Sequence, residues 1–143
     1  MKRGAAYWLR WLAALPGAVV SVVIASFLLH WVLYATLSSF VKPYPELPER
    51  LLYPFVAAVV FICAGSYIAP EHKLKTAIAL FGIWLFMWGG FVFLVLTGSD
   101  WFGFQLYIPG GAFGVIMAVA GAVTGLLVAR AIEKRYRIAR LPG

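Results

Sequence analysis

Four long runs without a charged residue dominate this sequence and limit what it can fold into. They cover residues 11–41, 51–70, 76–99 and 101–129. Each has the roughly 20 residues that an α-helix needs to cross about 30 Å of hydrocarbon. Strands of membrane barrels are shorter and alternate apolar with polar residues, whereas these runs are continuously apolar. The sequence therefore predicts an all-α membrane protein with four transmembrane helices.

Composition supports the same class of protein. The chain is 64% hydrophobic and 12% charged, with a mean hydropathy of +0.92, while soluble domains are about a quarter charged. We expect one integral membrane domain over residues 1–143, folded as an antiparallel bundle. Its helices are expected at about residues 12–41, 50–69, 71–98 and 106–135.

The first apolar run is too long for the apolar region of a secretory signal, which has about 7 to 15 residues. We therefore expect a retained first helix. The aromatic residues around its start, Tyr7, Trp8 and Trp11, suggest an anchor at the membrane interface, in the form of a short in-plane helix that ends at Pro16.

Lys and Arg residues are distributed unequally between the two ends of the expected helices. Ten lie at the termini or between the second and third runs, and two, Lys42 and Arg50, lie on the other side. Because cytoplasmic loops carry the excess of basic residues, we expect both termini in the cytoplasm of a bacterial inner-membrane type of plasma membrane. Residues 42–50 and 98–107 are then exterior loops.

The formal net charge of +7 does not indicate nucleic-acid binding, because the basic residues flank apolar runs and form no soluble surface. Anionic lipid headgroups on the cytoplasmic side are the expected partner. Each basic residue near such a surface contributes about 1 kcal/mol of attraction. The expected headgroup-binding residues are those of the C-terminal tail: Arg130, Lys134, Arg135, Arg137 and Arg140.

Small residues recur on the fourth run and, more sparsely, on the third. Helices associate in lipid where small residues allow their backbones to approach closely. We expect the fourth helix to be the most buried, with the third as its closest neighbour. The expected packing residues are Gly82 and Gly89 on the third helix and Gly114, Ala118, Gly121 and Gly125 on the fourth.

One polar row stands out within the first run, where Ser26, His30, Tyr34 and Ser38 are spaced by four residues and so share one side of a helix. An ionisable residue within a membrane suggests a functional site. Two interpretations remain open: a neutral imidazole that holds helices together, or a proton, ligand or cofactor site. The other histidine, His72, falls in the predicted cytoplasmic loop, so the two cannot form a bis-histidine haem site within one subunit.

The sequence shows no catalytic constellation and no metal-ligand or cofactor motif, so we expect no enzyme activity, metal or cofactor. We expect an accessory or scaffold subunit that packs through its Gly/Ala ridge against other membrane subunits or, as a homo-oligomer, against itself. The alternative is a small transporter, channel or lipid-binding protein with an outward-facing polar pocket around His30. An enzyme that acts on quinone or lipid has no residues in its favour.

Overall fold

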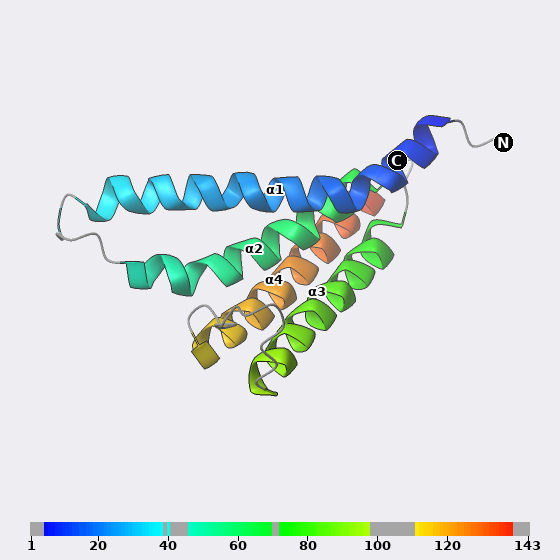
Figure 1. Cartoon of the computed structure of the whole chain (residues 1–143). Helices are drawn as coiled ribbons and strands as arrows, with labels where there is room; N and C mark the ends of the chain where they lie inside the picture. Colours follow the sequence, from blue (N-terminus) through cyan, green and yellow to red (C-terminus); the bar gives the residue numbers. More distant parts are fainter. Residues whose placement is uncertain (1–4, 39, 41–45, 70–71, 98–110, 139–143) are drawn as a thin grey trace.

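The computed structural model describes residues 5–38, 40, 46–69, 72–97 and 111–138, and these residues form four α-helices (Figure 1). The helices are α1 (Ala5–Leu37), α2 (Glu46–Ile68), α3 (Lys73–Leu96) and α4 (Gly111–Ile138). All four are long and apolar enough to cross a membrane. The prediction of an all-helical chain with four candidate spans is confirmed, and the expected loop at residues 98–107 lies outside the described residues.

The first two helices begin earlier than expected. α1 starts at Ala5 and continues through Pro16, so the aromatic N-terminal segment is part of α1 and is not a separate in-plane helix. An internal proline removes one backbone hydrogen bond without necessarily ending a helix. α2 starts at Glu46, with Pro48 in its first turn, where its missing N–H has no partner to lose. Glu49 and Arg50 are therefore helical residues.

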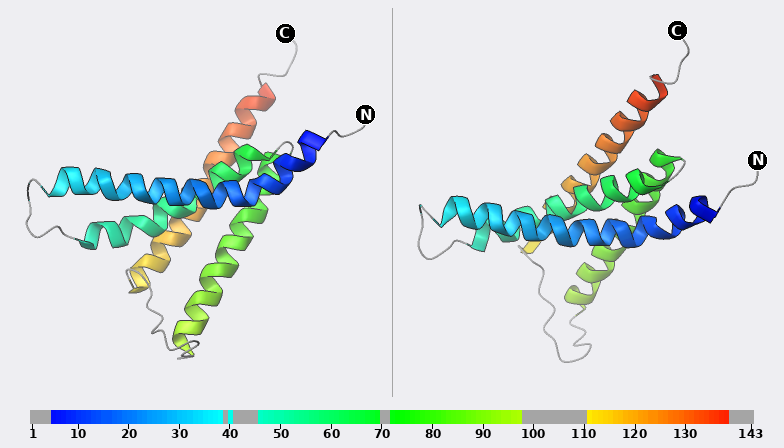
Figure 2. Two further views of the ribbon diagram at one scale, coloured as in Figure 1. Left: turned by 45° about the horizontal axis from the view of Figure 1, so that its top comes forward. Right: turned by 90° about the horizontal axis from the view of Figure 1, so that it is seen from above.

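α2 is the central helix of the molecule. Its backbone approaches α1, α3 and α4, whereas α1 approaches only α2 among the described helices. The views in Figures 1 and 2 show α3 and α4 crossing the α1–α2 pair obliquely, so the four helices do not all lie side by side. The helix that organises the fold is thus α2.

The core follows from this arrangement. It is made mostly of small residues from all four helices, with four members on α2, and it comprises Ala18, Ala57, Ala58, Phe61, Ile62, Ala77, Leu80, Trp84, Ala122 and Ala129. The expectation that the fourth helix is the most buried is wrong, because α2 has the larger buried share. The expectation that the third helix is its closest neighbour is also wrong, because α4 packs mainly against α2.

The small-residue face of α4 lies against α2. Gly114, Ala118, Gly121 and Gly125 are all buried. A Cβ atom built on Gly121 would lie 2.8 Å from the Cα of Phe55, and nearer still to the carbonyl oxygen of that residue. A Cβ on Gly125 would lie 3.3 Å from the Cα of Val59. The absence of side chains at these two glycines therefore permits the close approach of the two backbones.

The glycines of α3 have different surroundings. Gly82 and Gly89 are exposed, and no atom lies within 4 Å of a Cβ built on either residue. The buried residues of α3 are instead Thr76, Ala77, Leu80 and Trp84. Within the described part of the chain, the two glycines therefore do not pack against another helix, contrary to the expectation that they are packing residues.

α1 meets α2 through a second set of small residues. Ala14 and Ala18 are buried, and a Cβ built on Gly65 would lie 3.2 Å from the Cβ of Ala18. One built on Gly17 would collide with the side chain of Ile68. The N-terminal half of α1 is thus packed closely on the C-terminal half of α2.

Side chains also join α2, α3 and α4 where α3 begins. The Nζ atom of Lys73 lies 4.9 Å from the ring centre of Tyr67 and 4.4 Å from that of Tyr136. The backbone N–H of Leu74 donates a 2.9 Å hydrogen bond to the carboxylate of Glu133 on α4. His72, the residue before α3, makes no capping hydrogen bond with its side chain. Glu133 therefore accepts one of the free N–H groups of the first turn.

Candidate functional site

The candidate site is a histidine–glutamate pair that joins α1 to α2. The Nδ1 atom of His30 lies 3.0 Å from both Oε1 and Oε2 of Glu49. When Nδ1 carries a proton, it donates to this carboxylate, and when the ring is protonated the contact is also an ion pair. The side chain of His30 is 48% exposed and that of Glu49 is 28% exposed. The pair is therefore partly buried.

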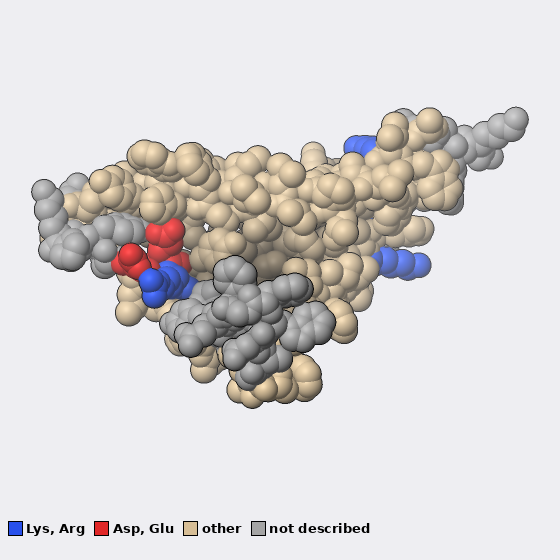
Figure 3. All heavy atoms as spheres, viewed as in Figure 1, with Lys and Arg blue, Asp and Glu red and all other residues tan. Residues whose placement is uncertain are grey.

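Aromatic rings surround the imidazole. The ring of Tyr34 stacks on that of His30 at 6.2 Å between centres, and the ring of Trp31 meets it edge-on at 6.4 Å. One turn before Glu49, Glu46 pairs with Arg50 on the same helix. Figure 3 shows acidic and basic side chains next to one another toward one end of the molecule, with further basic side chains at the opposite end.

The structure separates the members of the predicted polar row. The hydroxyl of Ser26 donates to the carbonyl of Val22 at 2.6 Å, within its own helix. Ser38 lies just past the end of α1, where its backbone N–H donates to the carbonyl of Tyr34. The side chains of His30 and Tyr34 are brought together by stacking, whereas the hydroxyl of Ser26 is bonded within its own helix. The four residues therefore do not form one polar row: His30 and Tyr34 belong to the candidate site, and Ser26 and Ser38 make hydrogen bonds to backbone carbonyls of α1.

Sequence reasoning missed Glu49. Residues 42–50 are expected to form a loop, because charged residues bound them and their three prolines favour extended or turn conformations. The available signal was the pair Glu46 and Glu49 around Pro48, since acidic residues and proline are both favoured in the first turn of a helix. A start of α2 four residues earlier would have placed a carboxylate within reach of His30.

The predicted headgroup residues lie at the C-terminal end of α4. Arg130, Lys134 and Arg135 are exposed, whereas the side chain of Arg137 and all of Arg140 lie outside the described residues.

Other chemically reactive groups do not form a site in the described part of the chain. No group of three or more His, Cys, Asp or Glu side chains there could hold a metal ion. The thiol of Cys63 contacts the carbonyl of Gly125 at 3.7 Å, between α2 and α4. Trp84 is buried against Phe61 with ring centres 5.4 Å apart. These residues contribute to packing.

Comparisons with known proteins do not identify a family. No family model, curated protein or solved structure matches this chain.

Proposed function

We propose that this protein is a non-catalytic subunit of a membrane assembly, which meets a partner helix or a second copy of itself through the outward face of α3. The observation that carries the proposal is that Gly82 and Gly89 are exposed, and that a Cβ built on either residue would meet no other helix within 4 Å in the described structure. The ridge on α4, which the sequence suggested for this role, is occupied by α2 within the chain.

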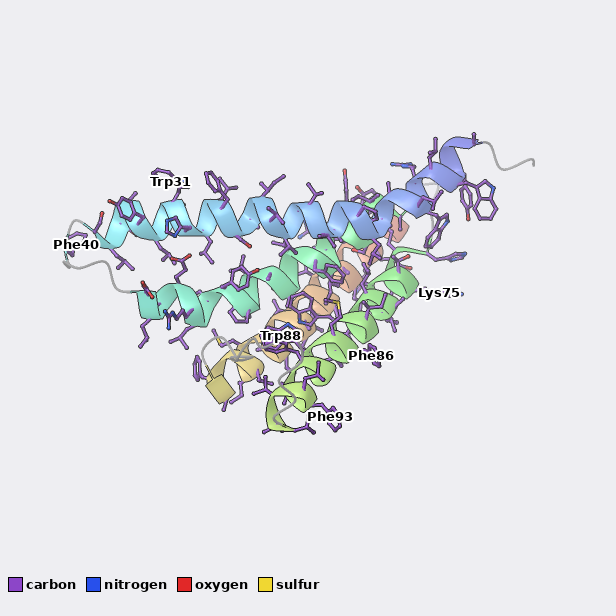
Figure 4. The ribbon with its side chains drawn as sticks, viewed as in Figure 1. Trp31, Phe40, Lys75, Phe86, Trp88 and Phe93 are labelled. Atoms are coloured by element: carbon purple, nitrogen blue, oxygen red, sulfur yellow. The ribbon has the colours of Figure 1, made fainter. Side chains whose placement is uncertain are left out.

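The α3 face has a defined composition. Gly82, Phe86, Gly89 and Phe93 follow at spacings of four, three and four residues and so share one side of the helix. Phe86 is 82% exposed and Phe93 is 64% exposed, and Figure 4 shows both rings pointing away from the other helices, while Trp88 points toward them. Glycines between large aromatic side chains form recesses in which the side chains of another helix can pack.

We further propose that the helices alternate in direction across a bacterial inner-membrane type of membrane, with both termini in the cytoplasm. The ten-to-two distribution of basic residues supports this orientation. The contacts between helices support this alternation. α1 and α2 run antiparallel, because Ala18 lies near Gly65 while His30, later in α1, lies near Glu49, earlier in α2. α2 and α4 run parallel, because Phe55 lies near Gly121 and Val59 lies near Gly125. Arg130, Lys134 and Arg135 are then placed to bind anionic headgroups.

A second candidate is a small transporter, channel or lipid-binding protein with a polar pocket around His30. The observation in its favour is the contact between His30 and Glu49, because an ionisable pair at the end of two apolar helices is a place for a cation or a polar headgroup to bind. This function requires a bound small molecule, whereas the subunit role requires a bound protein.

The test is purification of the protein from its native membrane in a mild detergent, followed by native mass spectrometry. We expect a stoichiometric protein partner or a second copy with the unmodified protein. The Gly82→Leu/Gly89→Leu variant should be recovered alone, because leucine side chains fill the recesses. The matched control is Ala120→Leu, at an exposed small residue of α4, which should retain the partner.

A monomeric unmodified protein, or a double variant that retains its partner, would contradict the subunit proposal. A stoichiometric lipid or small molecule on a monomeric protein would instead support the second candidate.

A further inference from the structure

The distal half of α1, residues 22–37, is attached to the rest of the protein differently from the N-terminal half. The N-terminal half packs closely on α2 through Ala14, Ala18 and Gly65. α1 has no other helix as a backbone neighbour in the described structure. In the distal half, exposed apolar side chains are numerous. A partly buried row that includes Val22, Leu29 and Leu33 follows one side of the helix, and the imidazole of His30 contacts the carboxylate of Glu49 on α2.

Several titratable or charged groups lie on the turns that face each other here. They are Tyr34 on α1 and Glu46, Glu49, Arg50 and Tyr53 on α2. Arg50 pairs with Glu46 one turn away on its own helix. Glu49 is the carboxylate within hydrogen-bond distance of the imidazole, so its charge is the one that responds most directly to the charge of His30.

We propose that His30 and Glu49 form a proton-sensitive latch that fixes the distal half of α1 against α2. Imidazole side chains ordinarily change charge between about pH 5 and pH 8. When the ring is charged, the contact is a charge-assisted hydrogen bond within an ion pair, and when it is neutral the contact is a weaker hydrogen bond to the same carboxylate. The latch is therefore tighter at mildly acidic pH and looser above neutral pH.

The contact between His30 and Glu49 should also weaken when the carboxylate is protonated. A protonated Glu49 is neutral and no longer attracts a charged imidazole. The closed population should consequently be greatest at intermediate acidity and lower on both sides. On release, the distal half of α1 can separate from α2, while the contact of Ala18 with Gly65 remains as the pivot.

The experiment measures the distance between the distal ends of α1 and α2 in lipid nanodiscs. Spin labels are attached to Thr36→Cys and Leu47→Cys, at two exposed positions outside the pair, in a Cys63→Ser background. Double electron–electron resonance is recorded from pH 3.5 to pH 8. Between pH 5.5 and pH 8 we expect the ratio of short to long distances to fall about two- to fivefold, the effect of a partly exposed ion pair.

Three variants define the source of the change. His30→Gln retains a hydrogen-bonding side chain without an imidazole, so its ratio should stay constant from pH 5.5 to pH 8. Glu49→Gln should lose the dependence over the whole range. The matched control is Glu46→Gln, at the neighbouring carboxylate paired with Arg50, which should behave like the unmodified sequence.

A constant ratio in the protein with both His30 and Glu49 would overturn the proposal, whether or not the variants fold. So would a ratio that rises with pH, or a pH dependence that persists in His30→Gln.

Discussion

Because the side chain of Gly121 is a single hydrogen atom, α4 can approach α2 closely at this residue. A methyl group there would lie 2.8 Å from the Cα of Phe55 and closer to its carbonyl oxygen, and a helix backbone cannot move aside as a flexible side chain can. We predict that Gly121→Ala lowers the free energy of unfolding by about 1–3 kcal/mol. Unfolding in a mixed detergent series, followed by circular dichroism, measures the change.

The matched control for this prediction is Gly82→Ala, because the space around Gly82 is open. Alanine favours a helix over glycine by up to about 1 kcal/mol, so this variant should be as stable as the original or more stable. Equal losses at Gly82 and Gly121 would mean that α4 does not approach α2 as described.

A graded effect is expected at Gly125. A methyl group there would lie 3.1 Å from the Cβ of Ile62 and 3.3 Å from the Cα of Val59, which is tight but requires only a small shift. We predict that Gly125→Ala is less destabilising than Gly121→Ala in the same unfolding measurement. Gly125→Leu should be at least as destabilising as Gly121→Ala. A larger loss for Gly125→Ala than for Gly121→Ala would contradict this order.

The site was only partly predictable at the scale of residues. Spacing identifies His30 and Tyr34 as neighbours on one helix, because the period of a helix is known in advance. It cannot identify Glu49, which lies on another helix and is brought to His30 by the position at which α2 begins. Spacing also included Ser26 in the site wrongly, because a serine within an apolar helix can donate its hydroxyl hydrogen bond to the carbonyl four residues earlier.

At the scale of an element, the start of α3 depends on a residue of α4. The N–H of Leu74 donates to Glu133, and His72 makes no side-chain cap. We predict that Glu133→Ala lowers the free energy of unfolding by about 0.5–2 kcal/mol, the usual effect of losing a capping group. Thermal unfolding in detergent checks the loss.

Glu133→Gln is the control for that prediction, because an amide oxygen still accepts the hydrogen bond. It should retain most of the stability. If Glu133→Gln and Glu133→Ala lose equal stability, the charge of Glu133 and not its capping bond is what matters.

The existence of each helix was predictable from its apolar run, but its neighbours were not. Gly114, Ala118 and Gly121 define a face that permits close contact, yet a single sequence does not show which helix occupies that face. α2 has small residues of its own at Ala57 and Ala58, so the two smooth faces pack together. Gly82 and Gly89 on α3 are seven residues apart, as are Gly114 and Gly121 on α4, but the two glycines of α3 lie on its exposed side.

At the scale of the whole molecule, the proposed orientation leads to a direct prediction. With both termini in the cytoplasm, alkaline phosphatase fused to either end should be inactive, and green fluorescent protein should be fluorescent there. The control is an internal phosphatase fusion after residue 44, which should be active because that loop is predicted to be exterior. Activity of the terminal phosphatase fusions would reverse the orientation.

The central position of α2 has a consequence for the order in which a ribosome completes the fold. α2 leaves the ribosome second, but the helix with which it packs most extensively is α4, the last of the four to be synthesised. During the synthesis of α3 and the segment after it, the small-residue face of α2 must be held in the membrane without its native partner, and α1 can already be in place. A nascent chain that stops before residue 111 therefore has an unfilled interface, which is the form of this protein that a membrane chaperone or protease would recognise.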